Sequence, residues 1–276
     1  VLSYISLILG HFLDIYTEVT INYMMKNNFI EKVQALYNSC NIENDSHKYF
    51  IIFSLEITTL YICKTNNNEL ALNWILNLFS IGEKHQGDAS MKSFQFMINI
   101  FEKFELPDEF VANLQDEFEV FLQNVQYIVD HDSEHEDMIS YSDWGQCAFA
   151  AFIQQNKDRI DYESAVQIFC ELFPPSEENE ISDYAFSLMV NLCYEQNPVV
   201  FSDNFPEIID NLVSNMHFGM MKPNTSEKLI NFLKGIITNP DYGPKVISVL
   251  SDSELKRNDE KILEILNAGA ASLSQI

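Results

Sequence analysis

Apolar residues fall three or four positions apart along most of this 276-residue chain, and that spacing predicts helices. Phe205, Ile208, Ile209, Leu212 and Val213 illustrate the pattern, because they share one side of a predicted helix. The chain has only 8 Gly and 8 Pro, which is too few for the many tight turns of an all-β fold. The spacing therefore predicts an all-α chain.

The predicted helices pair into hairpins that polar turns separate. First helices of successive hairpins begin near residues 47, 89, 139, 179 and 223, an interval of about 40 to 50 residues that matches the two-helix HEAT or armadillo class. Each hairpin buries its apolar stripe against the next, so we expect one α-solenoid over 1–276, wound as a right-handed superhelix. The predicted hairpins span about 1–38 (helices 1–14 and 17–38), 47–81, 89–129, 139–173, 179–217 and 225–249, with a capping helix over 252–267.

Helix-start signals support several of these boundaries. Pro206 suits the first turn of its helix, with Asp203 or Asn204 available as the cap. Asn224, followed three residues later by Glu227, predicts a capping box at the start of another helix.

Charge is the second informative feature of the sequence. The chain has 41 acidic and 16 basic residues, a net charge of −25. Between Glu105 and Met221 there are 24 acids and two bases, so this region carries −22 of that charge. Such a region repels nucleic acid and anionic membranes and attracts basic partners. The alternative, an acidic protein that is merely well solvated, would spread its charge more evenly.

Several classes of function are disfavoured. The five cysteines are odd in number and widely spaced, without CxxC pairs, so we expect buried thiols in a reducing compartment: Cys40, Cys63, Cys147, Cys170 and Cys193. The sequence contains no GxSxG, P-loop or GxGxxG motif, and burial raises a thiol pKa, which disfavours a Cys–His nucleophile. We expect a chain that binds partners, with no enzymatic activity and no cofactor.

Nothing in the sequence predicts a membrane span or a secretory signal peptide. The chain starts at Val1, inside a predicted helix, so we expect a fragment of a longer protein.

One acidic segment, residues 130–137, contains many potential ligand atoms. With His131 and His135 it could form a metal site, but the order lacks both the HExxH spacing and the glycine of an EF-hand loop. We prefer a solvated loop between hairpins that attracts Lys/Arg-rich segments. Its candidate binding residues are Asp130, Asp132, Glu134, Glu136 and Asp137.

From Ser142 onward the sequence resembles the last HEAT repeats of the importin-β (karyopherin-β) superfamily, closest to the branch that imports ribosomal proteins and histones. The features that carry the resemblance are a helix stop and acidic turn at Leu172–Glu178, an Asn197–Pro198 turn, the helix start Phe205-Pro206-Glu207-Ile208, and the tail from Val246. Two features depart from the family pattern: the helix start Trp144-Gly145-Gln146, and Phe in place of Leu at position 205.

The resemblance implies a nuclear transport receptor that shuttles between cytoplasm and nucleus. Such receptors are monomers that wrap basic cargo on an acidic concave surface lined by second helices, bind Phe-Gly nucleoporins, and release cargo to the GTPase Ran. The main Ran-binding repeats would lie outside this chain, and neither nucleic acid nor membrane would bind directly. The candidate cargo residues on second helices are Asp161, Glu163, Glu171, Glu207 and Asp210.

Two alternatives stay open at this point. The chain could be a HEAT scaffold subunit of a stable multiprotein complex, or, more remotely, a metal-dependent enzyme that uses His131 and His135.

Overall fold

The structure is a computed structural model that describes residues 2–41, 44–84, 87–131, 136–176, 181–251 and 259–273. These residues form 14 α-helices and one short 3₁₀ helix and contain no strand, which confirms the all-α prediction. The chain divides into two compact units, Val1–Tyr162 and Glu163–Ile276. A single array over the whole chain therefore stays a prediction.

Unit 1 contains eight described α-helices, followed by the 3₁₀ helix η1 (Lys157–Arg159). Their bounds are α1 (Leu2–Ile15), α2 (Thr17–Lys26), α3 (Phe29–Tyr37), α4 (Asp45–Thr65), α5 (Asn68–Gly82), α6 (Gly87–Phe101), α7 (Asp108–His131) and α8 (Glu136–Asn156). Helix α7 begins directly after Pro107, whose carbonyl accepts the Val111 N–H at 3.0 Å, so this proline starts its helix.

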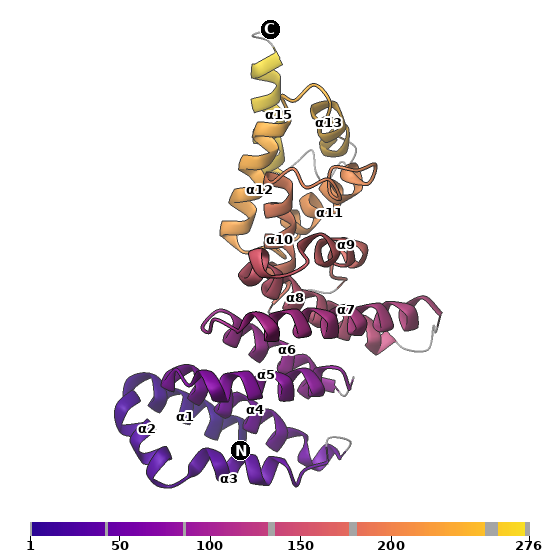
Figure 1. Cartoon of the computed structure of the whole chain (residues 1–276). Coiled ribbons are helices and arrows are strands. Elements are labelled where there is room, and N and C mark those ends of the chain that lie inside the picture. Colours follow the sequence, from indigo (N-terminus) through magenta and orange to yellow (C-terminus); the bar gives the residue numbers. More distant parts are fainter. Residues whose placement is uncertain are drawn as a thin grey trace. The chain divides into compact units, whose positions relative to one another are not determined.

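Helices α1, α4, α6 and α8 form a row in which each packs against the next (Figure 1). Helix α5 packs on both α4 and α6, and α7 packs on α8, so a second set of helices lies against the row. Aromatic rings fill the core between them. Phe118 of α7 lies 5.1 Å from Phe79 of α5 and 5.3 Å from Phe149 of α8, between ring centroids.

The structure divides the segment predicted as one helix over 17–38. Helix α2 ends at Lys26 and α3 begins at Phe29, because Asn28 adopts a left-handed conformation with φ of 48°. Asparagine tolerates that conformation better than most residues, and it ends a regular helix. The first predicted hairpin is therefore a three-helix element.

Unit 2 contains six described helices. Their bounds are α9 (Tyr162–Leu172), α10 (Ser182–Tyr194), α11 (Phe205–His217), α12 (Pro223–Ile236), α13 (Gly243–Ser251) and α15 (Glu260–Leu273). Helices α10, α12 and α15 form one row, and α11 packs on α13. The stripe predicted on α11 is the buried side of that helix, with Phe205, Ile209, Leu212 and Val213 fully buried.

The predicted helix starts in unit 2 are right in one case and wrong in another. Pro206 does lie in the first turn of α11, although the Asn204 side chain makes no capping hydrogen bond. The capping box of Asn224 and Glu227 is wrong, because Lys222 is the N-cap of α12. Pro223 occupies the first helical position, where its fixed φ starts the helix before Asn224.

Among the described residues, no helix combines the length and the hydropathy needed to cross a bilayer.

Candidate functional site

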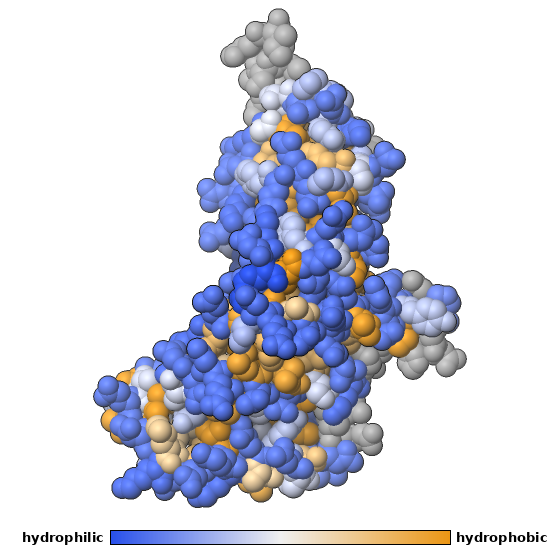
Figure 2. Space-filling model, viewed as in Figure 1, coloured by the Kyte–Doolittle hydropathy of each residue, from blue (hydrophilic) through white to orange (hydrophobic). Residues whose placement is uncertain are grey.

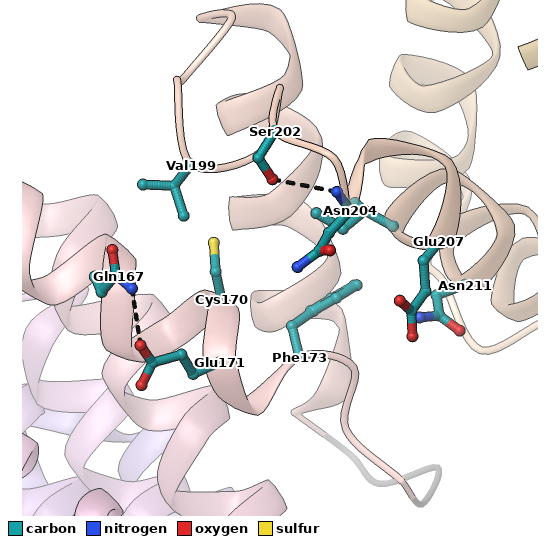
Figure 3. Close-up of a pocket in the computed structure, with 10 residues that line it drawn as sticks. Gln167, Cys170, Glu171, Phe173, Val199, Ser202, Asn204, Glu207 and Asn211 are labelled. Atoms are coloured by element: carbon teal, nitrogen blue, oxygen red, sulfur yellow. Dashed lines mark hydrogen bonds between the residues drawn. The ribbon is translucent and has the colours of Figure 1, made fainter. Parts of the chain in front are cut away.

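The candidate site is an open pocket of about 430 Å³ in unit 2, lined by α9, α11 and the segment between α10 and α11 (Figure 3). This volume lies within the range of about 300–1,000 Å³ that is usual for ligand pockets. The ten lining residues are Gln167, Cys170, Glu171, Phe173, Val199, Ser202, Asn204, Glu207, Ile208 and Asn211.

Helical spacing brings the polar residues of each wall to the pocket. On α9, Gln167 and Glu171 are four residues apart, and the Gln167 amide donates to the Glu171 carboxylate at 2.8 Å. On α11, Glu207 and Asn211 have the same spacing. In Figure 3, Glu171 and Glu207 lie on either side of Phe173. The two helices thus carry two carboxylates and two amides to one opening.

The third wall comes from the segment after α10. There, the Asn197 side chain accepts a hydrogen bond from the Val199 backbone at 3.0 Å, and the Ser202 hydroxyl accepts one from the Asn204 backbone at 3.3 Å. These bonds from short polar side chains to nearby amides are typical of turns, and they fix the path of the chain over the pocket.

Apolar side chains provide the other half of the lining. Phe173 packs on Phe169 and Phe186, with ring centroids 5.9 Å and 5.8 Å away, so its position is set by the core of unit 2. Val199 and Ile208, both half-buried, complete this apolar surface. An elongated side chain could therefore place an apolar stem on Phe173 and a polar head at a carboxylate.

The electrostatics of the pocket are one-sided. None of its ten lining residues is basic. From Glu163 to Met221 the sequence contains 10 acids and no Lys or Arg, so unit 2 offers no nearby basic residue from this stretch to neutralise Glu171 and Glu207. The negative charge at the pocket therefore favours the approach of positively charged groups.

The cysteine in the pocket is not a plausible nucleophile. Burial, together with the neighbouring Glu171 charge, raises the pKa of Cys170 to about 12, so the thiolate is rare at neutral pH. Burial also raises the thiol pKa of Cys40, Cys63 and Cys193. Cys147 and Cys193 are fully buried and the other three half-buried, so the expectation of buried thiols holds fully for two of the five.

The structure brings two of the predicted binding residues together, Glu171 and Glu207. Glu163 lies in the first turn of α9, four and eight residues before Gln167 and Glu171, on the same side of that helix. Asp210 of α11 is half-buried and is not among the lining residues.

Asp161 belongs to unit 1. Its backbone N–H donates to the Gln115 side-chain oxygen at 2.9 Å, and its carbonyl accepts from the Gln115 amide at 3.0 Å. The buried Gln115 thus fixes the chain at Asp161, while the Asp161 side chain is exposed.

The predicted acidic loop is shorter than expected. Asp130 and His131 belong to α7, and Glu136 and Asp137 to α8, because both helices extend into the segment. Asp132, Glu134 and His135 lie outside the described residues. Within the described part of the chain, no group of three or more His, Cys, Asp or Glu side chains is arranged to hold a metal ion.

Sequence reasoning missed most of the pocket. Gln167 and Asn211 could have been found, because each lies four residues from a predicted glutamate on the same helix. Phe173, Val199 and Asn204 could not, because only the folded chain brings the turns before α10 and before α11 against α9.

No protein-family model, no curated protein and no solved structure matches the chain.

Proposed function

We propose that this chain is the C-terminal part of an importin-β-type nuclear import receptor, a HEAT-repeat α-solenoid that binds basic protein cargo. One observation carries the proposal. Glu171 and Glu207, both expected to contact cargo, line a single open pocket in a stretch that has 10 acids and no Lys or Arg. The transport cycle is proposed from the resemblance to importin-β receptors that begins at Ser142. The rows of packed helices are compatible with an α-solenoid.

The lining of the pocket fits a lysine or arginine side chain of a partner. Its aliphatic stem would pack on Phe173 and Ile208, while its charged end would meet Glu171 or Glu207. The side-chain carbonyl oxygens of Gln167 and Asn211 would accept further hydrogen bonds from the same group. Contacts of this kind are weak one by one, so an extended basic segment would bind through several acidic side chains at once.

Reversible electrostatic binding also suits a transport cycle. At 0.1 M ionic strength, salt screens the attraction between exposed charges that are more than about 10 Å apart. We therefore expect fast, salt-sensitive association with basic segments, which a competing partner could reverse.

The test is binding of a fluorescent Lys/Arg-rich peptide to the whole chain, measured by anisotropy at several salt concentrations. We expect the double variant Glu171→Gln/Glu207→Gln to bind about fivefold to tenfold more weakly, since each exposed ion pair contributes about 0.2–1 kcal/mol. The slope of affinity against salt concentration should also become shallower.

Glu227→Gln/Asp241→Asn is the matched control, because both side chains are exposed in unit 2 and the change in net charge is the same. It should bind the peptide almost as well as the unchanged chain. Equal weakening by both double variants would show that net charge alone attracts the peptide, and the pocket would then not be the site.

The transport part of the proposal needs a second readout, made with the full-length protein. Basic proteins bound from a cell extract should leave when GTP-loaded Ran is added. Their retention would rule out the transport cycle.

The alternative function is a HEAT scaffold subunit in a stable complex. Exposed apolar side chains on α1 favour this alternative, because a permanent interface buries apolar surface and its affinity depends little on salt concentration.

A further inference from the structure

The pocket in unit 2 is one-sided in hydrogen bonding as well as in charge. On α9, the Gln167 amide group donates to one oxygen of Glu171 at 2.8 Å, which leaves the second Glu171 oxygen and the Gln167 carbonyl oxygen for a ligand. On α11, the side chains of Glu207 and Asn211 make no hydrogen bond to another residue that the structure describes. Both walls therefore offer acceptor oxygens to a group that carries several donors.

These acceptors lie around an aromatic ring. Phe173 is half-buried and lines the pocket, and its ring packs on Phe169 and Phe186, so the core of unit 2 fixes its position. In Figure 3, Glu171 and Glu207 lie on either side of this ring. A ligand group that rests on Phe173 would therefore have a carboxylate at two of its edges.

The apolar part of such a site is small. On the face that Figure 2 shows, hydrophilic residues cover most of the upper part, where Figure 1 places α10, α11 and α12, and hydrophobic residues form small patches among them. In the pocket, the apolar lining consists of Phe173, Val199 and Ile208. The group that fits is thus one with a small apolar face and donors at its edge.

Arginine and lysine differ in these two properties. The guanidinium group of arginine is flat, stacks on aromatic rings and carries five N–H donors in a planar fork, so it can donate sideways while its face lies on Phe173. The ammonium group of lysine is compact and strongly hydrated, and its three donors sit on one atom. In an open pocket it would meet one carboxylate and keep much of its water.

We infer that the pocket is selective for arginine over lysine, with Phe173 as the stacking surface and Glu171 and Glu207 as acceptors at two edges of the guanidinium. The inference rests on the proposed function and narrows it: one arginine of a basic segment binds in the pocket, and the other acids of unit 2 attract the rest of the segment by charge. Methylation of that arginine would weaken binding, because it keeps the charge and blocks paired hydrogen bonds.

The test compares two fluorescent peptides that differ only in their basic residues, all arginine in one and all lysine in the other. Anisotropy with the whole chain should show the arginine peptide binding about fivefold more tightly, since stacking on an aromatic ring adds to the paired hydrogen bonds. A third peptide, with asymmetric dimethylarginine in place of arginine, should bind no more tightly than the lysine peptide.

The variant Phe173→Leu keeps an apolar residue at this position but removes the ring. It should bring the two affinities to within about twofold of each other, mainly by weakening the arginine peptide. Phe218→Leu is the matched control, because Phe218 is 68% exposed, belongs to the same unit and does not line the pocket. It should leave the preference for arginine unchanged, and circular dichroism checks that both variants are folded.

The outcomes separate this inference from the proposed function. If neither peptide binds, the proposed function fails and the inference with it. Equal binding of the arginine and lysine peptides would overturn the inference alone, and so would a dimethylarginine peptide that binds as tightly as the unmodified one. A preference for arginine that survives in Phe173→Leu would also overturn it, since the preference would then arise outside the pocket.

Discussion

At the scale of single residues, Asp259 connects two elements of unit 2. One oxygen of its carboxylate lies 2.6 Å from Nδ1 of His217, in the last turn of α11. The other accepts hydrogen bonds from the backbone of Lys261 at 2.8 Å and Ile262 at 3.4 Å, at the start of α15. Asp259 therefore caps α15 and also ties it to α11.

These contacts affect the pKa of Asp259. Burial acts against the charged carboxylate, but the hydrogen bonds from His217 and the two amides, with the charge of His217, outweigh it and hold the pKa below its ordinary value. The charged form thus stabilises the native state at pH values above the ordinary pKa. That stabilisation disappears as the pH falls through the lowered pKa.

We expect Asp259→Ala to lower the free energy of unfolding at neutral pH by about 1–2 kcal/mol, the usual cost of losing an N-cap. As the pH falls from about 5 to about 2, the stability of the variant should fall less than that of the unchanged chain. Urea unfolding across this pH range measures both effects. Asp241→Ala, at an exposed aspartate of the same unit, should change neither, and the prediction fails if its curves match those of Asp259→Ala.

At the scale of elements, two helical glycines contrast in what surrounds them. A methyl group added to Gly145 of α8 would come within 2.5 Å of the Phe121 ring of α7. One added to Gly235 of α12 would meet nothing within 4 Å. Gly145 thus allows α8 to pack closely on α7.

The substitution Gly145→Ala should destabilise the protein by about 1–3 kcal/mol, because the overpacking cost exceeds the gain in helix propensity. Gly235→Ala is its matched control and should stabilise by about 0.5–1 kcal/mol, since only the propensity gain remains. Chemical unfolding of both variants gives the comparison. A stabilised Gly145→Ala chain would mean that α7 and α8 pack less closely than the structure indicates.

At the scale of the whole molecule, charge is distributed unevenly. Arg159, one of the two basic residues between Glu105 and Met221, pairs with Asp108 at 2.7 Å. Most of the 24 acids between Glu105 and Met221 therefore have no basic side chain in that stretch to balance them. Repulsion among such charges opposes folding, and dissolved salt screens it.

We expect the unfolding temperature to rise with sodium chloride concentration up to about 0.5 M, in the range where screening shortens the Debye length below about 5 Å. Differential scanning fluorimetry measures the shift, and choline chloride at the same ionic strength should give the same result. A temperature that stays constant or falls would show that repulsion does not limit stability.

Most helices could be predicted from the sequence because apolar periodicity is a local property. For α11 the predicted and observed bounds coincide, and the stripe from Phe205 to Val213 is its buried side. The break at Asn28 and the N-cap at Lys222 were missed, since each depends on a single residue whose conformation the periodicity does not reveal.

The sequence by itself determined that the chain is helical and that its acids gather between Glu105 and Met221, since helix period and net charge depend only on residue order and type. Only the tertiary structure decided which acids share a site. Glu171 and Glu207 are 36 positions apart, and they meet in one pocket because α9, α11 and the turn before α11 pack around Phe173.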